Sequence, residues 1–249
     1  MVRKAIEMIF ERIETLLNSR KTDLPVMPST QRNNEGWLLR LTLDLSASID
    51  LKDGRHPLTV PLGSRWDSEA LLPSAFLPEF RGDAMAESLT HADAFMGHFD
   101  IGNGEKEELT LRPDVRHFVV IEAKMHSKLS AGVKKAAYFD AAARNEACIT
   151  EVLKRTIRQA QEFKALGFYV LSSQINQGLF DEYLTKTSLR TVVERRVDEY
   201  GDKHCRCFSG WYLPTLDRLD IKAICWEDLI AVRYPDAEPT KTSMLAAWN

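Results

Sequence analysis

Hydrophobic and polar positions recur with a recognisable period in several parts of the chain. Over residues 2–17 the apolar side chains follow the spacing of one helix face, which predicts a helix. Every second residue from 39 to 45 is leucine, and this period of two predicts a half-buried strand over residues 37–45. Residues 58–60 predict another short strand.

The middle of the chain has the pattern of a β-sheet. Residues 92–101 predict a strand, and Asn103-Gly104 after it is a turn signal. Residues 117–124 form an apolar run that becomes polar only at its end. Such a run is typical of a buried central strand.

A helical pattern follows over about residues 133–166, and Gly167 ends it. Ser127 or Ser130 is the expected cap. We expect this helical region to be interrupted near Asn145 or Thr150.

The last third of the chain alternates between strand and helix. Residues 168–171 predict a short buried strand, 181–200 a helix and 221–225 a further strand. The whole order of elements predicts an α/β protein with a mixed central β-sheet flanked by helices.

Composition narrows the class of protein without naming a function. The chain has 249 residues, of which 44% are hydrophobic and 28% charged, which is typical of a soluble globular protein. Its net charge of -3 provides no global basic field, so a nucleic-acid partner would need local patches. Neither a signal peptide nor an apolar run long enough for a membrane span is evident, and we expect a cytoplasmic protein with no membrane partner. His204, Cys205 and Cys207 lie close together, but with Cys225 they do not make a convincing four-ligand zinc set.

Glu122 and Lys124 end the predicted strand at 117–124 with opposite charges. Side chains two positions apart on a strand project from the same face, while Ala123 between them points to the other. Burying a charge without a partner is unfavourable, so this ending indicates chemistry. The alternative is a salt-bridged strand end that emerges into solvent.

A second carboxylate near Glu122 would complete a site for a hard cation, because two acidic side chains and a backbone carbonyl suit Mg²⁺ or Mn²⁺. Asp114, in a literal Pro-Asp pair, precedes Glu122 by eight residues. An extended interval of that length separates the two residues by about 26 Å. We therefore expect Asp114 in a turn that Pro113 begins.

Asp93 and Asp100 are the upstream candidates. If the strand at 92–101 forms an antiparallel hairpin with the next strand, its beginning lies beside the end of that strand, near Glu122. Asp93 is at this beginning, whereas Asp100 lies beside the turn. The geometry favours Asp93, and Asp100 remains the alternative.

These residues resemble the PD-(D/E)XK nuclease superfamily, which has the restriction-endonuclease-like fold. The resemblance rests on Asp93, a hairpin, the string Val-Val-Ile-Glu122-Ala-Lys124, a following helix and a Phe-Tyr-Val-Leu strand, and it covers about residues 87–172. Strings similar to those of uncharacterised bacterial proteins lie at Thr90–Ala94, Ile121–Met125 and Ala142–Asn145. A glutamine often precedes the last string, where this chain has Ala141.

The resemblance implies that Asp93 and Glu122, with the backbone carbonyl of Ala123, bind one or two Mg²⁺ or Mn²⁺ ions. It implies that Lys124 helps to hydrolyse a phosphodiester. Many members add an upstream glutamate, and Glu87 stands where one is expected; a solvated helix residue is the alternative for Glu87.

The resemblance also implies one domain over residues 1–249, with the nuclease-like core at about 87–172 and the terminal elements packed on it. The expected function is a metal-dependent endonuclease, with DNA favoured over RNA. A helicase or ATPase partner in a bacterial antiviral defence system is compatible with this function. The alternative is a non-catalytic subunit that binds nucleic acid or a partner protein.

Basic side chains follow the motif and would suit phosphate contacts. They are Lys128, Lys134, Lys135 and Arg144, and then Lys154, Arg155, Arg158 and Lys164. Glutamates among the second group favour a solvated helix face there.

Overall fold

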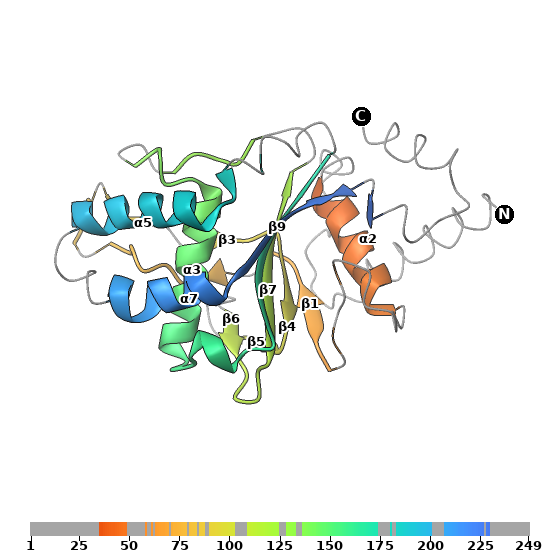
Figure 1. Cartoon of the computed structure of the whole chain (residues 1–249). Coiled ribbons are helices and arrows are strands. Elements are labelled where there is room, and N and C mark those ends of the chain that lie inside the picture. The colour runs from red at the N-terminus through yellow and green to blue at the C-terminus, as the bar shows by residue number, and fades with distance from the viewer. Residues whose placement is uncertain are drawn as a thin grey trace.

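The chain forms a mixed five-stranded β-sheet with helices on both of its faces (Figure 1). The structure is a computed structural model. It describes residues 35–48, 58, 61, 63–69, 71–78, 80–83, 85–87, 90–102, 109–124, 128–132, 136–173, 180, 183–200, 207–226 and 228–229. The helix predicted at 2–17 and the turn at Asn103-Gly104 lie outside these residues.

Helices and strands alternate along the described part of the chain. The helical elements are α2 (Glu35–Ser48), α3 (Ala141–Arg155), η2 (Ala160–Glu162), α5 (Lys186–Tyr200), η3 (Phe208–Tyr212) and α7 (Leu213–Arg218). The strands are β1 (Arg65–Asp67), β2 (Leu71–Leu72), β3 (Thr90–His91), β4 (Ala94–Gly97), β5 (Phe99–Ile101), β6 (Leu109–Leu111), β7 (His117–Lys124), β8 (Ala165–Ser172) and β9 (Asp220–Cys225). In the part of the chain described here, no helix combines the length and the apolar character that a membrane crossing requires.

The order of strands in the main sheet is β1-β4-β7-β8-β9. β4 is antiparallel to both β1 and β7, whereas β7, β8 and β9 run parallel to one another. Two small antiparallel pairs, β2 with β3 and β5 with β6, lie outside this sheet. The beginning of β4 therefore lies beside the end of β7, as the hairpin geometry predicts.

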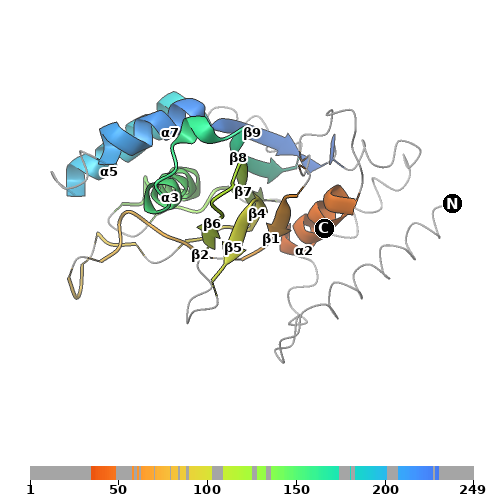
Figure 2. The same cartoon turned by 90° about the horizontal axis from the view of Figure 1, so that it is seen from below.

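Each face of the sheet is covered by its own hydrophobic core. Seen from below, α3, α5 and α7 lie on one side of the sheet and α2 on the other (Figure 2). The α3-side core includes Phe95, Phe118, Val120, Phe139, Ile149, Phe168 and Val170. The α2-side core includes Leu39, Leu43, Ala94, Met96, Ile121, Ala123 and Leu171. Alternate residues of β4, β7 and β8 thus enter opposite cores, so every even position of β7 faces α3.

Helix α3 begins where Asp140 caps it. The Asp140 carboxylate accepts hydrogen bonds from the backbone N–H groups of Ala142 and Ala143, at 2.9 and 3.0 Å. The predicted cap at Ser130 is therefore wrong. The aspartate satisfies N–H groups that the first turn of a helix leaves without a partner.

Helix α3 then runs to Arg155 without the predicted interruption. Asn145 and Thr150 are both buried inside it, at 1% and 3% exposure, so tertiary contacts outweigh their low helix propensity. The helix ends at Thr156, and Ile157 takes a left-handed conformation with φ 52°. Gly167, predicted to end this helix, lies inside β8.

The strand predicted over residues 37–45 is helical and belongs to α2. Leu39 and Leu43 are fully buried, and Leu38 is 4% exposed. Residues four apart lie on one face of a helix, so this leucine pattern fits both a strand period of two and a helix period near four. Packing of the leucines against the sheet favours the helix.

The strand predicted over 92–101 is divided into β4 and β5 at Gly97. Gly97 has φ +142°, and a Cβ atom added there would lie 2.0 Å from the carbonyl oxygen of His117. The chain turns away at this glycine, and β5 pairs with β6 instead of continuing along β7.

The other predicted elements agree more closely with the structure. The strand predicted at 117–124 is β7 with the same ends, and 168–171 lies within β8. The helix predicted at 181–200 begins at Lys186, and β9 covers 221–225. At 58–60 the structure describes only Leu58, which lies in a turn.

Candidate active site

Glu122 projects from the end of β7 into the layer between the sheet and α3. Its neighbour across the parallel β7–β8 pair is Val170, a residue of the α3-side core. Glu122 is 6% exposed, so its carboxylate is held away from bulk water. A buried carboxylate needs partners, because an uncompensated charge in the protein interior is strongly unfavourable.

Both oxygens of the Glu122 carboxylate have a polar partner. Oε1 lies 2.9 Å from Nζ of Lys124, and Oε2 accepts a hydrogen bond of 3.0 Å from Nδ2 of Asn145 on α3. The same-face relationship of Glu122 and Lys124 predicted from the sequence is therefore confirmed, and a helix residue fixes the far side of the carboxylate.

Asp93 reaches the same place from the segment that precedes β4. Ala94 pairs with Ile121, and one further step of this register sets Asp93 opposite Glu122. Oδ2 of Asp93 accepts a hydrogen bond of 2.7 Å from the backbone N–H of Ala123 and lies 3.8 Å from Nζ of Lys124. Asp93, Glu122 and Lys124 together form what we name the acid–lysine cluster.

Electrostatics within the acid–lysine cluster couple the two carboxylates. Burial raises the pKa of Glu122, the nearby charge of Asp93 raises it further, and Lys124 and Asn145 lower it. The exposed fractions of the side chains increase from 7% for Glu122 to 12% for Lys124 and 28% for Asp93. Solvent therefore reaches the cluster from the side of Asp93.

The other two aspartates considered from the sequence lie elsewhere. Asp100 is exposed on β5, where it pairs with Thr110. Asp114 lies in a turn and forms an exposed ion pair of 3.2 Å with Arg112, as expected for a turn residue. Among the three candidates, the structure places only Asp93 beside Glu122 and Lys124.

Glu87 belongs to a different buried cluster. It is 2% exposed, and neither oxygen of its carboxylate has a hydrogen-bond partner within the described part of the chain. Burial raises the pKa of Glu87 to about 6, and the charges of Arg144 and Arg196 oppose that increase. The alternative of a solvated helix residue is wrong. Its charged neighbours are arginines, and Asp93 and Glu122 are not among the groups that shift its pKa.

Asn145 is a site residue that the sequence analysis did not assign. It ends the string at Ala142–Asn145 that is similar to strings of uncharacterised bacterial proteins, and the sequence pattern suggested it only as a helix interruption. Ala141, where a glutamine is often found, lies four residues earlier and so on a neighbouring part of the same helix face. In this chain Asn145 donates an amide hydrogen bond from α3 to the Glu122 carboxylate.

The acid–lysine cluster offers a limited set of metal ligands. Among the described residues, no group of three or more His, Cys, Asp or Glu side chains is placed to hold a metal ion. Two carboxylates remain, with the backbone carbonyl of Ala123. This carbonyl lies on the Asp93 side of β7, because the N–H and C=O of one strand residue point the same way. The set suits Mg²⁺, which commonly uses one or two carboxylates and keeps several water ligands.

Basic side chains differ in how available they are. Lys154 and Arg155 both pair with Glu151, and Arg158 pairs with Glu162, at 2.9 to 3.0 Å. Lys128 is exposed, and Arg144 is partly exposed beside Ser130. Arg144 therefore lies in the first turns of α3, where its charge also acts on the buried carboxylate of Glu87, and the charges at the far end of α3 are compensated by Glu151 and Glu162.

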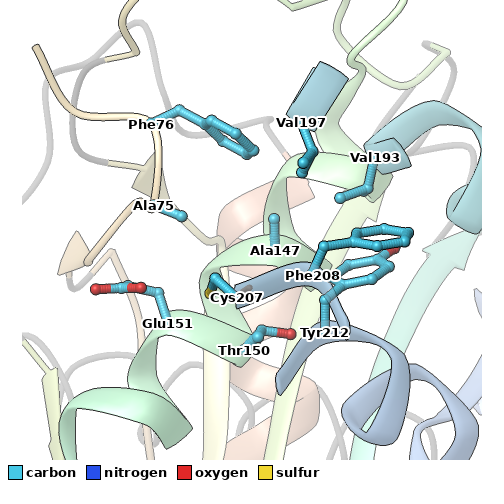
Figure 3. A pocket seen from close by; sticks show the side chains of 10 residues that line it. All are labelled: Ala75, Phe76, Ala147, Thr150, Glu151, Val193, Val197, Cys207, Phe208 and Tyr212. Atoms are coloured by element: carbon cyan, nitrogen blue, oxygen red, sulfur yellow. The ribbon is translucent and has the colours of Figure 1, made fainter. Parts of the chain in front are cut away.

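A small cavity of about 20 Å³ lies between α3, α5 and η3 (Figure 3). Its walls include Ala147 and Thr150 of α3, Val193 of α5 and Phe208 of η3. None of the acid–lysine cluster lines it, and its volume suits about one water molecule. It is too small to be a substrate site.

The four residues considered for zinc are only partly within the described chain. His204 and Cys205 lie outside it, Cys207 is partly exposed and Cys225 is buried.

A comparison of the chain with protein-family models, curated proteins and solved structures gives no match. The interpretation of the site therefore depends on its geometry.

Proposed function

We propose that this protein is a metal-dependent nuclease of the PD-(D/E)XK superfamily, with a restriction-endonuclease-like core, that hydrolyses phosphodiester bonds. The observation that carries the proposal is the convergence of Asp93, from the segment before β4, on Glu122 and Lys124 of β7, with Asp93 Oδ2 accepting a hydrogen bond from the N–H of Ala123. A structural salt bridge at a strand end needs one acid for one lysine. Two acids, one of them buried, against a single lysine favour a site for a cation.

Asp93, Glu122 and the carbonyl of Ala123 would hold Mg²⁺ or Mn²⁺. Such a metal would supply Lewis-acid chemistry, making a water more nucleophilic and neutralising charge that develops on the phosphate. In the metal-free structure the Lys124 ammonium lies beside both carboxylates, and its charge at the site would serve to orient the attacking water. Asn145 fixes the rotamer of Glu122 from α3. The reaction is a direct hydrolysis and needs no covalent enzyme intermediate.

Nucleic acid is the proposed substrate, with DNA favoured over RNA. Lys128 is exposed ahead of α3 and Arg144 is partly exposed in the first turns of α3, and we assign phosphate contacts to these two side chains. Contacts of this kind bind without reading sequence and weaken as salt concentration rises.

A cleavage assay tests the proposal directly. Single- and double-stranded DNA and RNA are incubated with wild-type protein and Mg²⁺ or Mn²⁺, beside Lys124→Ala and Glu122→Ala whose folding is verified by circular dichroism. We expect metal-dependent cleavage by wild type and loss of at least a hundredfold in both variants, as removal of one key electrostatic group typically produces. Cleavage by both variants at the wild-type rate would overturn the proposal.

Metal titration separates the remaining outcomes if wild type cleaves no substrate. Mg²⁺-linked thermal stabilisation that disappears in Glu122→Ala would indicate a nuclease that a helicase or ATPase partner activates. Absence of such stabilisation would instead indicate a non-catalytic subunit that binds nucleic acid or a partner protein. In either case the free protein is not the active nuclease proposed here.

A further inference from the structure

Two polar groups beside the acid–lysine cluster are buried without a hydrogen-bond partner. Ser172 is 0% exposed and Asn145 is 1% exposed. Within the described residues, Oγ of Ser172 and Oδ1 of Asn145 have no partner. A buried polar group without a hydrogen-bond partner destabilises the folded protein. At a candidate site, such a group is therefore expected to bind a partner in another state of the protein.

Ser172 lies next to Lys124 in the sheet. The two are register partners across the parallel β7–β8 pair, one step beyond Glu122 and Val170. Val170 faces the α3-side core, and Ser172 two residues later points to the same face. The hydroxyl therefore flanks Lys124 on the β8 side, whereas Asp93 approaches from the β4 side.

The second unpartnered atom is the side-chain oxygen of Asn145, which binds Oε2 of Glu122 through its amide nitrogen, whereas Lys124 binds Oε1. The Glu122 carboxylate can only accept hydrogen bonds when ionised, so the amide nitrogen of Asn145 must face it, and Oδ1 is the atom that remains. Oγ of Ser172 and Oδ1 of Asn145 are neutral acceptors, and a lysine ammonium is a donor with three N–H groups.

A metal ion bound by Asp93 and Glu122 would compete with Lys124 for the same oxygens. Nζ of Lys124 lies 2.9 Å from Oε1 of Glu122 and 3.8 Å from Oδ2 of Asp93, so the two cations cannot both remain close to these atoms. The ammonium then needs neutral acceptors on the side away from Asp93.

We propose that Ser172 is a positioning residue, whose hydroxyl accepts a hydrogen bond from the Lys124 ammonium when a divalent cation occupies the acid pair. This inference rests on the proposed metal site and extends it. Lys124 thus has two positions: against Glu122 in the metal-free protein, and against Ser172 in the metal-bound protein. In the second position its charge remains beside the metal without blocking the carboxylates.

Substitution of Ser172 tests the inference through metal binding, which requires no cleavage. Mg²⁺ affinity is measured by calorimetry for wild type, Ser172→Ala, Ser172→Thr and Ser173→Ala. Ser173 is the matched control, because it is also a buried serine whose hydroxyl has no partner among the described residues. It follows Ser172 directly, so its side chain points to the opposite face of the sheet, away from Lys124. We expect about tenfold weaker binding in Ser172→Ala, the effect of losing a hydrogen bond to a charged group. Binding should change by less than about threefold in Ser172→Thr, which keeps the hydroxyl, and in Ser173→Ala.

NMR of lysine side chains labelled with ¹³C at the ε position gives a second measurement. The Lys124 signal, assigned through its loss in Lys124→Arg, should shift when Mg²⁺ is added to wild type. In Ser172→Ala the metal-free signal should stay unchanged and the Mg²⁺-induced shift should be lost. A merely structural serine would instead alter the metal-free signal.

The outcomes separate this inference from the proposed function. Equal Mg²⁺ affinity in Ser172→Ala and wild type, or Ser172→Thr as weak as Ser172→Ala, overturns the role of Ser172 even if wild type cleaves DNA. Wild type that binds Mg²⁺ but cleaves nothing overturns the nuclease activity, while the affinities still decide the role of Ser172. Wild type that binds no Mg²⁺ overturns both.

Discussion

The carboxylate of Asp93 accepts a 2.7 Å hydrogen bond from the backbone N–H of Ala123, the residue between Glu122 and Lys124. This contact joins a side chain that precedes β4 to the main chain of β7, and it continues the antiparallel register of the two strands. Asp93 therefore has two separable properties: an acceptor that anchors the segment before β4, and a negative charge close to Lys124.

Substitutions of Asp93 separate these properties. Asp93→Asn keeps an acceptor for the Ala123 N–H but removes the charge, so it should fold normally and lose Mg²⁺-dependent cleavage. Asp93→Ala should also be inactive, and the lost hydrogen bond should lower its unfolding free energy by about 1 kcal/mol. Cleavage assays and urea denaturation measure the two effects.

Asp114→Ala is the matched control for this prediction. Asp114 forms only an exposed ion pair with Arg112, so its removal should leave cleavage unchanged. The reverse result would be an active Asp93→Asn and an inactive Asp114→Ala. It would show that Asp114 of the Pro-Asp pair is the metal ligand, and that the pairing of β4 with β7 does not position the catalytic aspartate.

Gly97 provides a test of how β4 is positioned. A Cβ atom at Gly97 would lie 2.0 Å from the His117 carbonyl oxygen, and its φ of +142° is rarely adopted by other residues. Gly97→Ala should therefore lower the unfolding free energy by several kcal/mol, about 3 or more, as a combined clash and backbone strain. Gly82→Ala is the control, since Gly82 also has a positive φ, of +85°, but no atom lies within 4 Å of an added Cβ. Its loss should be limited to about 1 kcal/mol, and equal losses in the two variants would contradict the steric argument.

The sequence was informative where local pattern and tertiary environment agree. Residues 118–121 are apolar on both faces because β7 is central and covered by a core on each side, and the predicted ends of the strand match those of β7. The position of Asp93 followed from hairpin geometry alone, which depends on the antiparallel direction and not on side-chain packing.

The sequence was less informative where tertiary contacts decide between local alternatives. The leucines of α2 satisfy both a strand and a helix period, and only their packing against the sheet distinguishes them. Asn145 looks like a helix breaker in a linear sequence, but its partner Glu122 is 23 positions away. Glu87 was assigned by position in a resemblance, whereas its environment is set by burial and by the charges of Arg144 and Arg196, which are distant in the sequence.

Arg196 provides a test of the second buried cluster. Its side chain is fully buried, its guanidinium donates to the carbonyl oxygen of Met85, and three aromatic rings lie within 5.5 Å of it. Arg196→Met should lower the unfolding free energy by about 3 to 5 kcal/mol, because it leaves the carboxylate of Glu87 buried with one cation fewer. Chemical denaturation at pH 7.5 measures this loss.

Two further variants show whether charge or packing causes that loss. Arg195→Met removes the adjacent, exposed arginine, and its effect should stay below about 1 kcal/mol. The double variant Glu87→Gln with Arg196→Met should recover part of the stability, since no unpaired charge remains. A double variant that is as unstable as Arg196→Met would attribute the whole effect to lost packing.

Glu146 predicts a pH dependence of stability. It is 0% exposed on α3, and the hydroxyl of Tyr212 donates a hydrogen bond to its carboxylate. Burial raises the pKa of Glu146 from 4.5 to about 8, although the Tyr212 hydrogen bond and the charge of Lys186 lower it. Between these two values the folded protein keeps the proton that the unfolded chain releases. Glu146 therefore makes the unfolding free energy decrease as pH increases, by about 1.4 kcal/mol per pH unit within that window.

Glu146→Gln removes this titration and keeps an acceptor for Tyr212. We compare the unfolding free energy of the variant with that of wild type. The difference, variant minus wild type, should increase steadily from pH 5 to pH 8, whatever the value of this difference at pH 5. Other groups with raised pKa values, such as Glu87 and Glu122, titrate in both proteins and cancel in this difference. The control Glu162→Gln changes a partly exposed carboxylate, 38% accessible, so its difference should stay flat over the same range. A difference that does not change with pH for Glu146→Gln would show that Glu146 is already ionised in the folded protein. In that case Lys186 or solvent stabilises the charge of the buried carboxylate.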